Sequence, residues 1–233
     1  MTGSPVGVVS GSGIDLSALL DTVEERLPFE SIPGLTAGQV PGHRYGFVRG
    51  RCGARPVILQ QGRRHFYEGL DHAAVVRTVD ALRSLGAETV VFTNVVGGLL
   101  PTMEPGDLVA IDRVIPWRYH AWPGQPRELR PDFLLPGCSH TGAYVWMHGP
   151  CYETRAEVGA VQTLGGAVVG MSTAPELARC LELGLRTAVV SCVTNVSHHT
   201  EVLTHEHVVS VARHASERLV GLIRSALTNF LEN

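Results

Sequence analysis

The sequence has no lysine, so all 19 of its Lys or Arg residues are arginines. This absence excludes a catalytic lysine Schiff base and a phosphate-binding loop that ends in Gly-Lys-Ser/Thr. The chain also has no run of about 18 apolar residues, which a membrane-spanning helix requires. Its first residues, MTGSPVGVVSGSG, lack the basic segment and long apolar stretch of a signal peptide. We therefore expect a cytoplasmic protein that does not bind membranes.

The cysteine, histidine and serine patterns exclude several further kinds of site. The five cysteines form no CxxC pair and are odd in number, which argues against a disulfide framework and favours a reducing compartment. The histidines include adjacent His198 and His199, and His205 and His207 near a helix start, but no HExxH motif. These positions favour solvated or capping side chains over metal ligands. No serine lies in a GxSxG motif, so a serine-hydrolase triad is not predicted.

The remaining composition is that of an ordinary globular protein. With 233 residues, 44% of them hydrophobic and 18% charged, the chain has the size and apolar content of a single domain, 1–233. Its net charge of −3 gives no general affinity for nucleic acid.

Short apolar runs alternate with longer helix-like stretches. Strands are predicted at 6–10, 44–50, 56–60, 89–93, 107–115, 143–148, 167–170 and 186–193. Helix-like stretches are an amphipathic one from Asp15, then 71–85 with Asp71 as N-cap and Gly86 as stop, 153–165, and Thr204 to about Leu227. Five prolines predict a loop at 116–137. The alternation predicts an α/β fold, a three-layer sandwich with a mixed, largely parallel central sheet between helices.

Polar clusters follow several of the predicted strands. They are GSG (11–13), RRHFYEG (63–69), TNVVGG (93–98), GPCYETRAE (149–157), VGMST (169–173) and VTNVSHH (193–199). Because ligands bind where parallel strands end, we expect these clusters to meet in one site. Each alone also has a plain interpretation: a tight turn for GSG, a surface ion-pair patch with Glu68 for RRHFYEG, and an acid-preferring helix start for GPCYETRAE.

A site built from these clusters would have two corners. Ser12, Arg63, His65 and Ser172 would form an anion corner, because arginine, histidine and serine donate hydrogen bonds to phosphate oxygens. Glu153 and Asn195 would form an amide-and-carboxylate corner, which suits the polar edge of a heterocycle, and Tyr152 would stack on its ring.

The order of the motifs resembles the trimeric purine nucleoside phosphorylase and methylthioadenosine phosphorylase family. The matching motifs span nearly the whole chain: GSGI, VPGH (40–43), QGRRHFYEG, TNVVGGL, GPCYETRAE, VGMSTAPE, VTN and THEHV. The resemblance implies a nucleoside phosphorylase-like fold, a homotrimer, inorganic phosphate as co-substrate, and no metal or organic cofactor. It also implies phosphorolysis of the N-glycosidic bond of purine nucleosides to free base and ribose 1-phosphate.

The resemblance further implies a role for each matching residue. The phosphate-binding set is Ser12, Arg63, His65, Ser172, His43 and the backbone N–H of Val95. The ribose-binding set is Tyr67, Met171 and His205. The purine-binding set is Tyr152, Glu153 and Asn195, and the Glu153–Asn195 pair implies a preference for 6-oxopurines. Asn195, Glu153 and His65 are the expected catalytic residues, with Asn195 stabilising the leaving base.

Three departures from the family pattern keep alternatives open. The loop 116–137 is shorter than the family's segment, which supplies an aromatic residue to a neighbouring subunit; Tyr119, Trp122 and Phe133 are candidates to replace it. Val95–Val96 replaces a pair of small residues, and Val196 replaces a frequent lysine. The alternatives are a relative that acts on a modified or 5′-substituted nucleoside, a nucleosidase that uses water, and a catalytically inert nucleoside-binding protein.

Overall fold

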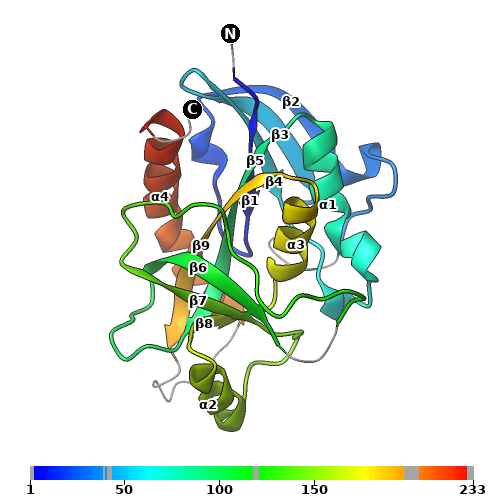
Figure 1. Cartoon of the computed structure of the whole chain (residues 1–233). Coiled ribbons are helices and arrows are strands. Elements are labelled where there is room, and N and C mark those ends of the chain that lie inside the picture. The colour runs from blue at the N-terminus through cyan, green and yellow to red at the C-terminus, as the bar shows by residue number, and fades with distance from the viewer. Residues whose placement is uncertain (1–2, 39, 41–43, 118–120, 197–204, 230–233) are drawn as a thin grey trace.

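The computed structural model describes residues 3–38, 40, 44–117, 121–196 and 205–229 (Figure 1). In this part of the chain nine strands form one mixed sheet, in the order β2-β3-β4-β1-β5-β8-β7-β6-β9. The strands are β1 Val6–Ser10, β2 Thr22–Pro28, β3 Gly46–Cys52, β4 Arg55–Gln61, β5 Thr89–Gly98, β6 Leu108–Pro116, β7 His140–Trp146, β8 Gly166–Gly170 and β9 Arg186–Val196. The helices are α1 His72–Ser84, α2 Arg155–Thr163, α3 Ala174–Glu182 and α4 His205–Asn229.

The centre of the sheet is parallel. β1 pairs in parallel with both β4 and β5, and β5 pairs in parallel with β9. The carboxyl ends of these four strands therefore lie at the same edge of the sheet. Because β9 pairs with β6 as well as with β5, the strands β5, β8, β7, β6 and β9 also close into a ring. The α/β fold with a mixed sheet that the sequence predicted is confirmed.

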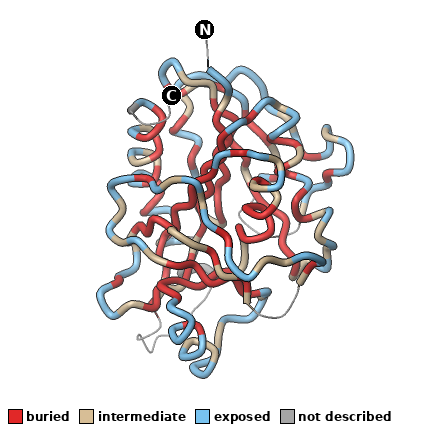
Figure 2. Tube along the Cα trace, viewed as in Figure 1, coloured by how far each residue is buried: buried red, intermediate tan, exposed pale blue. Residues whose placement is uncertain are grey.

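Helices cover both faces of the sheet, with α4 on one side and α1 and α3 on the other (Figure 1). The β1 sequence VGVVS is buried throughout, and its side chains alternate between the faces. Val8 packs in the core under α4 with Leu219, whereas Val9 packs in the opposite core with Val79 and Leu177. Figure 2 shows the buried residues running along the strands between the helical layers. This two-sided burial explains why the central strands are continuous apolar runs.

The helix predicted at 71–85 is confirmed, together with the N-cap and the glycine that were predicted to start and stop it. The Asp71 side chain caps α1 by accepting a hydrogen bond from the Ala74 amide at 2.8 Å. Gly86 follows the helix with a φ of +98°, a conformation that glycine adopts without a steric penalty. The hairpin of β3 and β4, the loop character of the segment after β6, and the final helix are confirmed as well.

The structure differs from the prediction in several elements. The stretch from Asp15 is not a helix: it forms a short 3-10 turn, Ser17–Leu19, and then the edge strand β2. β2 was missed because its sequence TVEERLP is polar and its strand character depends on pairing with β3. The helix α3 was also missed, and β5 continues through TNVVGG to Gly98 instead of ending at Thr93.

The segment after β6 is anchored to the core by Trp122. The Trp122 ring stacks on Phe66 at a centroid distance of 5.8 Å and on His72 at 5.4 Å, and it meets Trp146 edge-on at 5.5 Å. Phe133 also packs within its own chain, where the Arg186 guanidinium lies over its ring. Both rings therefore make contacts within this chain, and Tyr119 lies outside the described residues.

Replacing Trp122 by alanine should destabilise the protein by about 3–5 kcal/mol, because a buried indole leaves a large cavity. Urea unfolding would measure the change. Leu134, on the same segment and 47% exposed, gives the control: Leu134→Ala should change the free energy of unfolding by less than about 0.5 kcal/mol. Equal effects of the two substitutions would contradict the anchoring role of Trp122.

Candidate active site

A cavity of about 530 Å³ lies where the central strands end and their loops begin. It brings together nine of the residues predicted from the sequence: Ser12, His65, Tyr67, Val95, Tyr152, Glu153, Met171, Ser172 and Asn195. They come from loops after β1, β4 and β8, from β5 and β9 themselves, and from the segment before α2. The expectation that the polar clusters share one site is therefore met for these residues.

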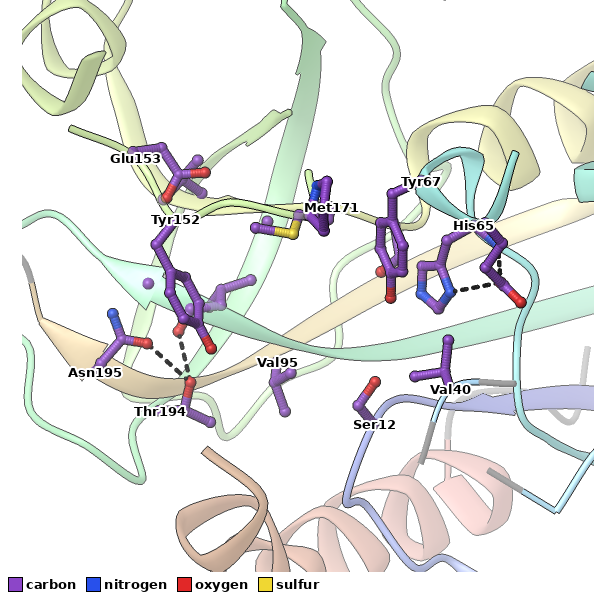
Figure 3. A pocket seen from close by; sticks show the side chains of 17 residues that line it. Ser12, Val40, His65, Tyr67, Val95, Tyr152, Glu153, Met171, Thr194 and Asn195 are labelled. Atoms are coloured by element: carbon purple, nitrogen blue, oxygen red, sulfur yellow. Dashed lines mark hydrogen bonds and ion pairs between the residues drawn. The ribbon is translucent and has the colours of Figure 1, made fainter. Parts of the chain in front are cut away.

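The two ends of the cavity differ in chemistry (Figure 3). Ser12, His65 and Tyr67 lie at one end, and Tyr152, Glu153 and Asn195 lie at the other. Met171 and Val95 lie between them and offer an apolar surface. A ligand in this cavity would thus meet hydrogen-bond donors at one end and a carboxylate, an amide and an aromatic ring at the other.

Arg63 lies behind the first end and not on its surface. Its side chain is 1% exposed, and its Nη1 donates to Ser172 Oγ at 2.8 Å and to Thr173 Oγ1 at 2.7 Å. Its Nε lies 3.7 Å from Glu176 Oε1, a carboxylate that is also buried. The interpretation of RRHFYEG as a surface patch paired with Glu68 is therefore wrong, because Arg63 is buried and pairs with Glu176.

Glu68 instead holds His65. One Glu68 oxygen accepts the His65 backbone N–H at 2.7 Å and lies 3.3 Å from Nδ1 of the ring. Burial raises the pKa of Glu68, but the hydrogen bonds and charge of His65 outweigh that effect and hold the pKa below its usual value. The His65 ring also stacks on Tyr67, with centroids 4.7 Å apart.

Ser172 is fixed through its backbone by Tyr144. The buried Tyr144 hydroxyl donates to the Ser172 carbonyl at 2.8 Å and accepts from the Ser172 amide at 3.1 Å. Burial raises the pKa of Tyr144, so this hydroxyl keeps its proton. The Ser172 side chain therefore has a set position at the wall of the cavity.

Asn195 is oriented by its neighbour Thr194. The Thr194 hydroxyl donates to Asn195 Oδ1 at 3.1 Å and also lies 3.3 Å from the Val96 carbonyl (Figure 3). Because Oδ1 already accepts a hydrogen bond, the Asn195 amide presents its Nδ2 as a donor. Thr194 also lines the cavity, and sequence reasoning missed this role because it arises from the contact between two adjacent side chains.

Glu153 and Tyr152 form the opposite wall. Burial raises the pKa of the Glu153 carboxyl, and the nearby charge of Glu157 adds to the shift. Tyr152 is 45% exposed, so much of its side chain is accessible. The pair can therefore offer a carboxylate of raised pKa beside a stacking surface.

Two predicted residues cannot be placed in the site. His43 lies outside the described residues, and His205 is the first residue of α4 but its side chain lies outside the described part. The structure adds Glu68, Val96 and Gly97 to the cavity lining. The His65-x-x-Glu68 spacing was the available signal for Glu68, since it forms a capping box at a 3-10 turn.

Over the described ranges, no group of three or more His, Cys, Asp or Glu residues could hold a metal ion. Within the same ranges, no helix is both long enough and apolar enough to span a membrane.

Comparisons with known proteins agree with the family resemblance that the order of the motifs indicated. A family model described as the phosphorylase superfamily matches residues 5–133 and 138–228. Purine nucleoside phosphorylase 1 of Geobacillus stearothermophilus is 29% identical, with 100% of this chain and 93% of the relative covered. The purine nucleoside phosphorylase of Bos taurus is 31% identical, with 92% and 85% covered.

Solved structures are similar over nearly the whole chain. Isoform 2 of the purine nucleoside phosphorylase of Schistosoma mansoni, in complex with cytosine and ribose-1-phosphate, is 27% identical with a TM-score of 0.80 and covers 98% of this chain and 91% of its own. A Schistosoma mansoni purine nucleoside phosphorylase in complex with inosine has a TM-score of 0.82, covers 98% and 92%, and at 24% identity shows the fold alone.

Inorganic phosphate should stabilise the protein through Arg63. At about a hundred times its dissociation constant, a ligand adds about 2.7 kcal/mol, which raises Tm by roughly 5–10 °C in a domain of this size. Because removing Arg63 alone would leave Glu176 buried and unpaired, the test variant is Arg63→Met with Glu176→Gln.

Thermal unfolding with phosphate, compared with chloride of equal ionic strength, measures the effect. The matched control is Glu176→Gln alone, which keeps Arg63 and should keep most of the phosphate-dependent shift, whereas the double variant should lose it. An equal shift in all three proteins would count against an anion corner that depends on Arg63.

Proposed function

The chain belongs to the phosphorylase superfamily, and from this premise we propose that it is a purine nucleoside phosphorylase. It is a pentosyltransferase that uses inorganic phosphate as co-substrate to release free base and ribose 1-phosphate. The observation that carries the proposal is a cavity that has hydrogen-bond donors at one end and Tyr152, Glu153 and Asn195 at the other. Phosphate would bind at the first end of the cavity and the purine at the second. The ribose, which exchanges its bond to the purine for a bond to phosphate, would lie between them beside Met171.

In the proposed reaction the phosphate lies among Ser12, His65 and Ser172, with the Arg63 guanidinium directly behind Ser172. One phosphate oxygen forms a bond to C1′ of the ribose as the bond from C1′ to the purine nitrogen breaks. The electron pair of the broken bond goes to the purine, which then takes up a proton. Positive charge develops on the ribose in the transition state, where the phosphate is its counter-charge.

The protein contributes position and electrostatics to this step. We assign Asn195 Nδ2 as the donor that stabilises the negative charge on the leaving purine, because Thr194 already occupies Asn195 Oδ1. Glu153 accepts the N1–H of a 6-oxopurine, and Tyr152 stacks on the purine ring. No covalent enzyme intermediate is required, so holding the two reactants in line supplies much of the catalysis.

We also propose a homotrimer in the cytoplasm, with no organic or metal cofactor, as the resemblance implies. Sedimentation equilibrium of the purified protein tests the assembly. A trimer mass supports this part of the proposal, and a monomer mass in an active enzyme overturns it.

Release of free base from inosine, guanosine, adenosine and methylthioadenosine, each with and without phosphate, tests the reaction. We expect release from inosine and guanosine that requires phosphate. Release that is equal without phosphate would overturn phosphorolysis in favour of hydrolysis. Release from adenosine or methylthioadenosine alone would keep the reaction but overturn the assigned base preference.

The base preference should depend on pH through Glu153. The raised pKa of Glu153 means that its carboxylate takes up a proton as pH falls, at a pH above the ordinary glutamate value of 4.5. The carboxylate accepts the N1–H of inosine, whereas the protonated form can donate to N1 of adenosine, which has no proton there. The ratio of kcat/KM for inosine to that for adenosine should therefore fall as pH falls.

The ionisation of phosphate affects kcat/KM for inosine and for adenosine equally, so its effect cancels in the ratio. Glu153→Gln is the matched control, because glutamine does not titrate and its ratio should be independent of pH. A wild-type ratio that does not change as pH falls would contradict the contact between Glu153 and N1.

A further inference from the structure

A buried polar cluster lies directly behind the anion end of the cavity. Its members are Arg63, Asn94, Thr173 and Glu176, whose side chains are 1%, 1%, 0% and 2% exposed. None of the four lines the cavity, whereas Ser172, which Arg63 contacts, does. The cluster therefore meets a ligand through Ser172.

The Thr173 hydroxyl is the centre of this cluster. It accepts hydrogen bonds from Arg63 Nη1 at 2.7 Å and from Asn94 Nδ2 at 2.9 Å. Both partners are nitrogen donors, and a hydroxyl oxygen has two lone pairs. With both lone pairs used, the Thr173 proton must point toward another acceptor, and Ser172 Oγ lies 3.4 Å away.

The Ser172 hydroxyl, which lies at the cavity wall, also has two lone pairs and one proton. Ser172 Oγ accepts from Arg63 Nη1 at 2.8 Å and is the acceptor available to Thr173. Once both lone pairs of Ser172 are used, its own proton cannot point back into the cluster and is directed to the cavity. Phosphate oxygens are acceptors, so a serine that presents its proton is in the state that phosphate requires.

The backbone at Thr173 supports a functional role for its side chain. Thr173 has a φ of +74°, which is a rare conformation for a β-branched residue and costs about 1–3 kcal/mol. Glycine would adopt this conformation without that cost. Its backbone amide is held by Glu176 Oε2 at 3.0 Å, so the strained turn is fixed by the cluster itself.

We propose that Thr173 is a positioning residue for phosphate, because its hydroxyl and Arg63 together fill the acceptor sites of Ser172 and turn the Ser172 proton toward the bound anion. This proposal rests on the proposed phosphorolysis. Thr173 does not touch phosphate, and its effect passes through Ser172.

Three substitutions separate the hydroxyl from the backbone strain. Thr173→Val removes the hydroxyl and keeps the branched shape, Thr173→Gly removes the hydroxyl and relieves the strain, and Thr173→Ser keeps the hydroxyl. Steady-state kinetics with inosine and phosphate should show that the valine and glycine variants raise KM for phosphate by about ten-fold to a hundred-fold, the value of one hydrogen bond to a charged group. KM for inosine should change by less than about two-fold, because the hydrogen bond that is weakened is made to phosphate and not to the nucleoside. The serine variant keeps the hydroxyl and should behave like the wild type.

Thr78→Val is the matched control for placing a valine in the interior. Thr78 is 0% exposed in α1, and its hydroxyl has no hydrogen-bond partner among the described residues. It should leave both KM values unchanged. If Thr173→Val does not fold, Thr173→Gly still decides the question, because glycine suits the positive φ.

The outcomes also distinguish this proposal from the proposed function. A wild type that releases no base with phosphate overturns phosphorolysis itself. A phosphate-dependent wild type whose valine and glycine variants keep the wild-type KM for phosphate overturns the role of Thr173 alone. Equal increases in KM for phosphate and inosine would show a structural role and would overturn it as well.

Discussion

The arrangement of the site depends on the burial of one positive charge. Arg63 follows β4 and carries its guanidinium charge into the interior of the protein, where an unpaired charge is costly. Glu176 at the start of α3 and the hydroxyls of Ser172 and Thr173 surround it. The end of β4, the start of α3 and the turn after β8 must therefore meet, and they meet beside the cavity.

Close approach of the strand ends completes the site. A side chain at Gly11 would place its Cβ 2.8 Å from the Asn94 Cα, so glycine at this position lets the loop after β1 reach the end of β5. At Gly170 an added Cβ would lie 2.7 Å from the Tyr144 hydroxyl, which would displace the group that holds Ser172. Each glycine is required for a specific approach, and GSG is therefore more than a tight turn.

Much of this arrangement could be predicted from local sequence. Buried strands are rich in β-branched residues, α1 has a capping aspartate, and polar clusters follow apolar runs. β2 and α3 could not be predicted in this way: β2 is a polar edge strand that requires β3, and α3 is a nine-residue helix whose N-cap, Thr173, has a positive φ. Their formation depends on partners that are distant in the chain.

The same limit applies to the site. The plain interpretation of RRHFYEG was a surface ion-pair patch with the nearby Glu68, whereas in the fold Glu68 holds His65 and the distant Glu176 faces the buried Arg63. Thr194 and Thr173 act by orienting neighbouring side chains, which a motif cannot show. The residues of the two corners do come together, while their roles toward phosphate and purine, and those of His43 and His205, stay predictions.

The central claim is that phosphate held at the anion end is the nucleophile for the nucleoside held beside it. Phosphorus NMR of a mixture of inosine, phosphate and enzyme tests this claim most directly. The account predicts that inorganic phosphate disappears and that one sugar phosphate forms for each hypoxanthine released. Release of hypoxanthine with free ribose, while the inorganic phosphate signal stays constant, would contradict it.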